Sequence, residues 1–95
     1  MHEYEMMYIL RPELDEAAVA AAIAKVSALV TGNGGEVTKA EPWGRRRLAY
    51  PIKQCREGQY VLMLYKLDAK AVTEVERALR ISEEVIRFLV IRQGN

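Results

Sequence analysis

The part of the sequence best suited to chemistry lies between Trp43 and Arg56, where five basic residues occur without a single acid. Guanidinium groups form paired hydrogen bonds with phosphate oxygens and stack on exposed bases, and Trp43 and Tyr50 add flat aromatic faces. These side chains are therefore suited to an RNA backbone. The five bases are Arg45, Arg46, Arg47, Lys53 and Arg56.

A second explanation of the same residues is structural. Charged side chains on an edge strand deter pairing between the sheets of two molecules, and Glu41, Arg46 and Arg47 are placed to do this. The two roles are compatible. The formal net charge of +1, from 14 bases and 13 acids, favours no class of partner, so only the uneven distribution of charge is informative.

Residues that commonly catalyse reactions are sparse. His2 is the single histidine and lies at the start of the chain. The paired acids Glu83-Glu84 and Glu13 with Asp15 are expected at turns and helix ends, where carboxylates are solvated or cap a helix. Cys55 is the single cysteine, which excludes an internal disulfide and a four-sulfur metal site. We expect no enzyme activity, no cofactor and no metal.

Length and composition set the class of protein. With 95 residues, 51% of them hydrophobic and 28% charged, the chain is typical of one soluble globular domain, residues 1–95. No apolar run approaches the roughly 20 residues that span a bilayer, and Met1-His2-Glu3 lacks the basic start of a secretion signal. One cysteine favours a reducing, cytoplasmic location.

Hydrophobic patterning predicts the first half of the fold. His2 to Leu10 is rich in aromatic and β-favouring residues and predicts a strand. Asp15 is a helix N-cap, with Leu14 and Val19 spaced as a hydrophobic staple. The helix ends at Gly32 and the following Asn33-Gly34-Gly35. Its apolar stripe comprises Val19, Ile23, Val26 and Val30.

The second half repeats this order. Two strand-like stretches, residues 36–53 and 59–67, are expected to join near residues 54–58. Residues 67–72 repeat the pattern of residues 14–19 and open a second helix, and residues 85–92 predict a final strand. Strand-helix-strand occurring twice indicates an α+β, ferredoxin-like β-α-β-β-α-β fold.

Two prolines, Pro42 and Pro51, fall in the second predicted strand. Because proline donates no ladder hydrogen bond, that strand is expected at an edge of the sheet. The four-stranded antiparallel order 2-3-1-4 of the ferredoxin-like fold places it there independently, with both helices on one face.

Both faces of this sheet are apolar in the sequence, although two helices cover only one. The side chains expected on the open face form a larger patch than a soluble monomer usually exposes, which favours a docked partner. Partial shielding by long neighbours such as Lys66 and Arg92 is the alternative. The expected patch consists of Met7, Ile9, Tyr60, Leu62, Leu64, Leu89 and Ile91.

Residues Gly44-Arg45-Arg46-Arg47-Leu48-Ala49-Tyr50-Pro51-Ile52-Lys53 resemble the signature of the sixth protein of the bacterial small ribosomal subunit. Three further blocks resemble that family in the same order and spacing: Tyr4 to Met6, Ile9 to Pro12 and Ala78 through Val90. The resemblance implies a ferredoxin-like fold, no enzyme activity and a place in the ribosome. It also implies pairing with the eighteenth small-subunit protein and joint binding to the central domain of small-subunit ribosomal RNA.

The resemblance also nominates functional residues. By the signature, Arg45, Arg46, Arg47 and Lys53 would contact RNA or the partner; Arg56 joins by proximity, and Arg80 and Arg87 by the last matching block. Glu41 and Trp43 on the edge strand join the open face as the partner surface. Many family members carry a polar or acidic tail, so contacts made by such a tail are expected to be absent or reduced in a chain that ends at Asn95.

Other functions of this topology fit less well. An RNA-recognition module stacks bases on third-strand aromatics, but Gly58-Gln59-Tyr60-Val61 brings the aromatic too early. An acylphosphatase-like enzyme needs an anion-binding glycine loop where this chain has residues 11–14, Arg-Pro-Glu-Leu. A copper chaperone needs paired cysteines. A small-molecule regulatory domain that dimerises through the open sheet is the main rival, although its ligand loop is also missing.

Overall fold

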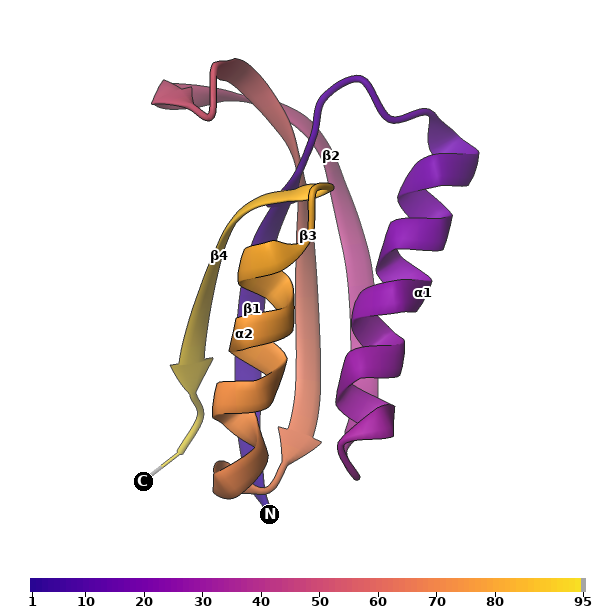
Figure 1. Ribbon diagram of the computed structural model, residues 1–95, viewed down its shortest axis with the longest axis vertical. Coiled ribbons are helices and arrows are strands. Elements are labelled where there is room, and N and C mark those ends of the chain that lie inside the picture. The colour runs from indigo at the N-terminus through magenta and orange to yellow at the C-terminus, as the bar shows by residue number, and fades with distance from the viewer. Residues whose placement is uncertain (95) are drawn as a thin grey trace.

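The computed structural model describes residues 1–94 as one four-stranded antiparallel sheet with two helices on one face. Strand β1 is His2–Leu10, β2 Glu36–Ile52, β3 Cys55–Leu67 and β4 Val85–Arg92. Helix α1 is Glu16–Gly32, and α2, Val72–Ile81, follows a 3-10 turn, η1, at Ala69–Ala71. The order β2-β3-β1-β4 confirms the predicted ferredoxin-like fold and the edge position of β2. Figure 1 shows α1 and α2 in front of the sheet.

Helix α1 begins where the sequence predicts, and the second helical segment begins as a 3-10 turn. The Asp15 carboxylate accepts a hydrogen bond from the Ala18 amide at 2.8 Å, so it caps α1. Asp68 caps in the same way, accepting from Lys70 N at 3.0 Å, but the segment first forms η1 and becomes α-helical at Val72. The C-terminal end of α1 closes through Gly34, whose φ of 84° suits glycine.

The main core lies between the sheet and the helices. Tyr4, Met6, Tyr8 and Leu10 of β1 alternate into it, as predicted. From α1, Val26 and Val30 are buried as expected, whereas Ala22 is buried more fully than Val19 or Ile23. The stripe is therefore rotated slightly towards the small Ala22 side chain, which lies on the side of α1 that faces α2.

One element boundary differs from the prediction. The turn between β2 and β3 is not at residues 54–58; it is the two-residue turn Lys53-Gln54, and β3 begins at Cys55. Both turn residues are left-handed, with φ of 49° and 67°. That conformation is the twist-matched solution for a two-residue hairpin, although Asn-Gly is its usual sequence. The hairpin is consequently longer than predicted.

Candidate nucleic-acid interface

The β2–β3 hairpin extends past the end of β1, and its tip reaches towards the start of β4 (Figure 1). Its bend comes from β2: Arg47 pairs with Glu57 and Ile52 with Cys55, so β2 carries three more residues than β3 in this interval. The extra length contains Leu48 and Pro51. Proline has no amide N–H to donate, but at this irregular position it interrupts no regular ladder hydrogen bond.

A small apolar cluster, separate from the main core, holds the bent hairpin. Ile9 is 7% exposed, Leu48 8%, Cys55 9% and Ile86 4%. Gly58 permits the packing, because a Cβ there would collide with Ile9 Cγ2. Ile86 reaches this face through an irregularity in the β1–β4 register, where Ile9 opposes Arg87 and Leu10 opposes Val85.

The three consecutive arginines do not act as one group. Arg45 pairs with Gln59 on the helix-covered side, donates to the Pro12 carbonyl at 2.7 Å and lies 3.9 Å from Glu57. Arg46 pairs with Gly58 and therefore lies on the opposite side of β2. Both Arg46 and Arg47 are exposed, as is Arg56. Arg45 is thus partly engaged by the β1–α1 loop, whereas the other three face solvent.

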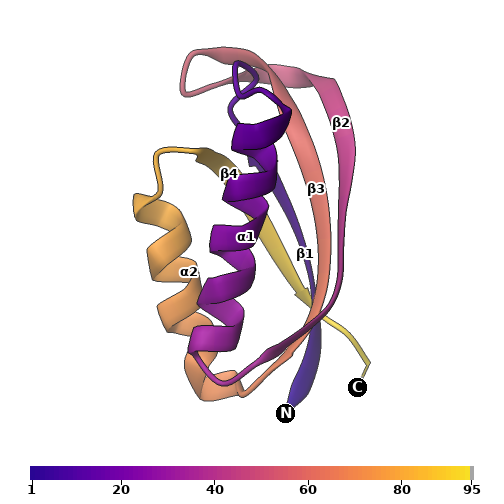
Figure 2. The same ribbon diagram turned by 90° about the vertical axis from the view of Figure 1, so that its right-hand side faces the viewer.

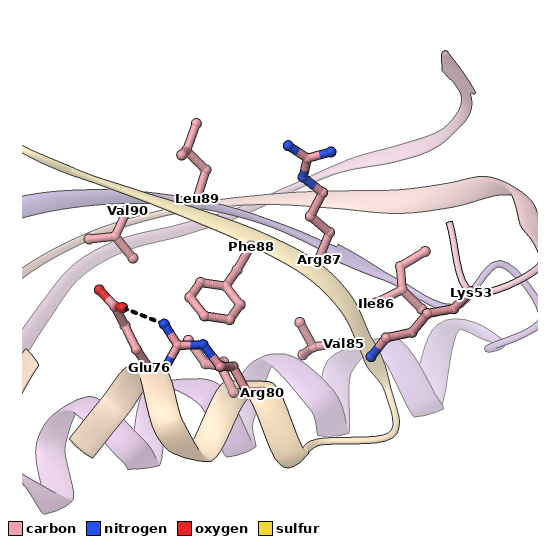
Figure 3. A pocket seen from close by; sticks show the side chains of 10 residues that line it. Lys53, Glu76, Arg80, Val85, Ile86, Arg87, Phe88, Leu89 and Val90 are labelled. Carbon is pink, nitrogen blue, oxygen red and sulfur yellow. Dashed lines mark hydrogen bonds and ion pairs between the residues drawn. The ribbon is translucent and has the colours of Figure 1, made fainter. Parts of the chain in front are cut away.

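The remaining predicted bases gather elsewhere, around a groove between β4 and α2 (Figure 3). Arg80 lies 5.7 Å from the centre of the Phe88 ring and 3.2 Å from Glu76. Arg87 lies 6.0 Å from the Tyr50 ring and donates a hydrogen bond to its hydroxyl. Lys53, at the hairpin tip, lines the same groove. The seven predicted bases therefore form two groups, one along the hairpin and one beside β4.

The predicted open face exists but is only partly exposed. Leu89 and Ile91 are exposed by 58% and 49%, whereas the Ile9 side chain is buried beneath the hairpin and is not available to a partner. That part of the prediction is wrong because the hairpin bends over the sheet, a tertiary contact with no local signal. The other members are half-buried: Met7, Tyr60, Leu62 and Leu64.

Glu41 and Trp43 extend this face onto the edge strand. Trp43 donates its indole N–H to Glu41 at 2.9 Å, and Lys39 lies 3.5 Å from the same carboxylate. The Trp43 hydrogen bond, followed by the Lys39 charge, lowers the pKa of Glu41. Glu41 pairs with Leu62, so the charged edge adjoins the apolar patch directly.

Two residues that the sequence analysis did not single out position this region. The Gln59 amide donates towards the carbonyls of Arg11, Pro12 and Leu14, at 3.3, 3.3 and 2.7 Å. Arg11 donates to the Glu83 carbonyl at 2.7 Å and approaches Cys55 Sγ at 3.8 Å. They tie the β1–α1 loop, the hairpin and β4 together. A polar glutamine directly before the apolar run that starts at Tyr60 was the available signal.

Residues 1–94 contain no group of three or more side chains arranged to hold a metal ion. His2 contacts Arg92, at 2.7 Å, and Cys55 is buried. Within the same residues, no helix is long and apolar enough to span a membrane. Asn95, the chain end noted in the sequence, lies outside the described residues.

A ferredoxin-like sheet with a basic hairpin and a partly exposed apolar face is suited to a small protein that acts through binding surfaces. The model of the family "Ribosomal protein S6" matches residues 3–92, and the chain belongs to this family. It is therefore a structural constituent of the small ribosomal subunit, located in the cytoplasm with the ribosome, and the family is not one of enzymes.

Individual relatives agree. Small ribosomal subunit protein bS6 of Carboxydothermus hydrogenoformans is 47% identical over 93 residues, which cover 98% of this chain and 97% of that protein. The bS6 protein of Moorella thermoacetica is 41% identical over 92 residues, covering 97% and 94%. The crystal structure of 30S ribosomal protein S6 from Thermotoga maritima has a TM-score of 0.90 at 29% identity, covering 97% and 87%.

Proposed function

We propose that the whole chain acts as one ferredoxin-like domain that binds the central domain of small-subunit ribosomal RNA together with the eighteenth small-subunit protein. The observation that carries the proposal is the proximity of two different surfaces on β2. Exposed Arg46 and Arg47 continue the same strand as Glu41 and Trp43, which adjoin the apolar face at Leu62. A strand of this kind suits simultaneous contact with RNA and protein.

In this arrangement the protein partner covers the open face and the β2 edge. Leu89 and Ile91 supply its exposed apolar part, and Glu41 supplies charge at its rim. The hairpin bases Arg46, Arg47 and Arg56 meet the RNA backbone. Joint binding is cooperative because the partner adds phosphate contacts of its own and fixes the orientation of the hairpin.

Filter-binding titrations on a central-domain RNA fragment, with and without the eighteenth protein, test the proposal. Strong binding only when both proteins are present is the expected result. If a folded sample binds the RNA in neither condition, the proposal fails and the small-molecule regulatory alternative takes its place.

The partner surface is tested by Leu62→Lys with Leu64→Lys and by the more exposed Leu89→Lys, which should remove partner binding. Thr73→Lys on α2 is the matched control, and unchanged partner affinity in the patch variants would contradict the assignment.

Salt dependence separates the RNA contacts from the partner contacts. If the three hairpin bases that face solvent, Arg46, Arg47 and Arg56, each neutralise one phosphate, the slope of log K against log salt is roughly −2.1 to −2.7. Replacing Arg46 and Arg47 with glutamine should make the slope shallower by about 1.4 to 1.8. Lys70→Gln, on η1, should leave it unchanged. A slope near zero for the unmodified protein would exclude the phosphate contacts.

A further inference from the structure

The second edge of the sheet, β4, presents backbone groups that nothing in residues 1–94 pairs with. Gln93 donates to the Glu3 carbonyl at 2.8 Å, which makes Glu3 and Gln93 a directly bonded pair. In an antiparallel ladder such pairs alternate, so Ile91 and Leu89 bond to β1 while the intervening residues point away. The outward N–H and C=O groups are those of Phe88, Val90 and Arg92.

The two edges of the sheet differ in how they resist pairing. On β2, prolines and register shifts interrupt the edge at Pro42/Gly44 and between Arg47 and Ile52. Phe88 to Arg92 of β4 contain no proline and keep a regular register with β1. Phe88, Leu89, Val90 and Ile91 are all strand-favouring and apolar. A regular apolar edge of this kind readily accepts another strand.

A groove of ≈ 520 Å³ runs along this edge, between β4 and α2. Figure 3 shows Arg80 and the Lys53 ammonium on the helix side of β4, and Leu89 and Arg87 on the other side. Glu76 is the acid in the lining, and it already pairs with Arg80 at 3.2 Å. The groove is therefore apolar along β4 and positively charged around it.

We propose that the free edge of β4 binds an extended, acidic segment of a partner protein as a fifth strand. Main-chain hydrogen bonds to Phe88, Val90 and Arg92 supply the affinity. Side chains on one face of the added strand enter the groove, where carboxylates meet Arg80 and Lys53. Those on the other face continue the apolar surface of Leu89 and Ile91. The free length from Phe88 to Arg92 accommodates about five residues, or roughly 17 Å.

Two other occupants fit this edge less well. An RNA strand gains nothing from the apolar side chains of Phe88 and Val90 or from a row of outward carbonyls. A second copy of the chain would bring another set of Lys53, Arg80 and Arg87 against the first, and like charges repel. An acidic polypeptide satisfies the backbone groups, the apolar surface and the charge together. This surface shares Lys53 with the hairpin tip, but the proposal concerns the β4 edge and does not rest on RNA binding.

The test adds a capped nine-residue peptide of alternating glutamate and valine to the full chain. Amide hydrogen exchange of the protein is then measured by NMR. At saturating peptide, we expect exchange at Phe88, Val90 and Arg92 to slow at least about ten-fold. The Leu89 amide, already bonded to β1, is an internal control and should change little. The same peptide N-methylated at alternate residues, or with lysine in place of glutamate, should bind at least about ten-fold more weakly.

Charge is tested with matched variants on one helix. Arg80→Gln should weaken binding of the acidic peptide about three-fold or more, whereas Arg77→Gln, whose partner Glu74 is away from the groove, should not. Three results would overturn the proposal: no protection of the β4 amides at millimolar peptide, equal protection by an eight-nucleotide uridine RNA, or dimerisation through β4 seen by sedimentation without peptide. Thermal unfolding followed by circular dichroism verifies that each variant is folded.

Discussion

The buried hydroxyl of Tyr8 lowers the stability of the fold at a single residue. Tyr8 is fully buried in β1, and its hydroxyl has no hydrogen-bond partner within residues 1–94. A buried polar group without a partner loses its hydration and gains nothing in return. Tyr65, in the neighbouring strand, is also buried and stacks on Tyr4 with ring centres 5.6 Å apart. Tyr8 therefore contributes through its ring rather than through its oxygen.

Replacing Tyr8 with phenylalanine should raise the free energy of unfolding by about 1 kcal/mol, because the substitution removes the unsatisfied hydroxyl and keeps the ring. Chemical denaturation at neutral pH measures the change. Tyr65→Phe is the comparison in the same core layer. A loss of stability in Tyr8→Phe would show that the hydroxyl contributes a favourable interaction.

At the scale of the element, the β2–β3 hairpin combines an unfavourable turn with a close contact. Lys53 and Gln54 both have positive φ, which costs non-glycine residues about 1 kcal/mol each. Gly58 lies where a Cβ would collide with Ile9 Cγ2, so glycine allows the bent hairpin to pack closely on the sheet at this point. The turn is thus held in place by the packing of Leu48 and Cys55 rather than by its own sequence.

Gln54→Gly should stabilise the protein by about 0.5–1 kcal/mol, because glycine adopts the left-handed turn conformation without steric cost. Gly58→Ala should destabilise it by about 1–3 kcal/mol, since the added methyl group overpacks the contact with Ile9. Thermal and denaturant unfolding measure both variants. If Gln54→Gly and Gly58→Ala changed the free energy of unfolding in the same direction, or if Gly58→Ala left it unchanged, the hairpin would be able to adjust its bend.

At the scale of the whole molecule, the stability of the fold depends on the protonation of the core. Burial raises the pKa of Tyr8, and burial followed by the charges of Glu76 and Tyr4 raises that of Tyr65. In the unfolded chain a tyrosine loses its proton near pH 10. Above that pH the folded protein holds protons that the unfolded chain has released, so stability falls as pH rises.

The free energy of unfolding should therefore decrease above about pH 10, with a limiting slope of about 1.4 kcal/mol per pH unit for each of the two tyrosines. Urea titrations between pH 8 and 11.5 measure the slope. In Tyr8→Phe, which cannot ionise at this position, it should be shallower by one such increment. The same slope in both proteins would place the alkaline sensitivity on other groups.

The sequence predicts the regular parts of this fold well and its long-range contacts poorly. Alternation of apolar residues gives β1 and β4 with the bounds that the structure shows, and Asp15 marks the start of α1. The hairpin turn is missed because Lys53-Gln54 carries no turn signal, while Gly58, which does, lies inside β3. Glycine serves close packing there, a role that depends on Ile9, far away in the sequence.

For the candidate interface, too, the sequence predicts local properties but not long-range contacts. The residue types predict a basic surface and an apolar face, because composition and alternation are local properties. Local properties do not reveal that Arg45 turns towards the Pro12 carbonyl, that Ile9 is covered, or that Ile86 is re-aimed by a register shift. Each of these depends on contacts between distant segments. The roles of the individual bases stay predictions.

The hairpin is packed on its own small cluster, apart from the main core between sheet and helices. Segments with few buried apolar contacts open locally at lower free energy than the whole molecule unfolds. We therefore expect amides near Arg46 and Arg47 to exchange through a local opening that leaves α1, α2 and the centre of the sheet intact. A ligand that binds the hairpin disfavours this opening. The slowing of amide exchange should therefore appear first in the β2–β3 hairpin, which carries Arg46 and Arg47.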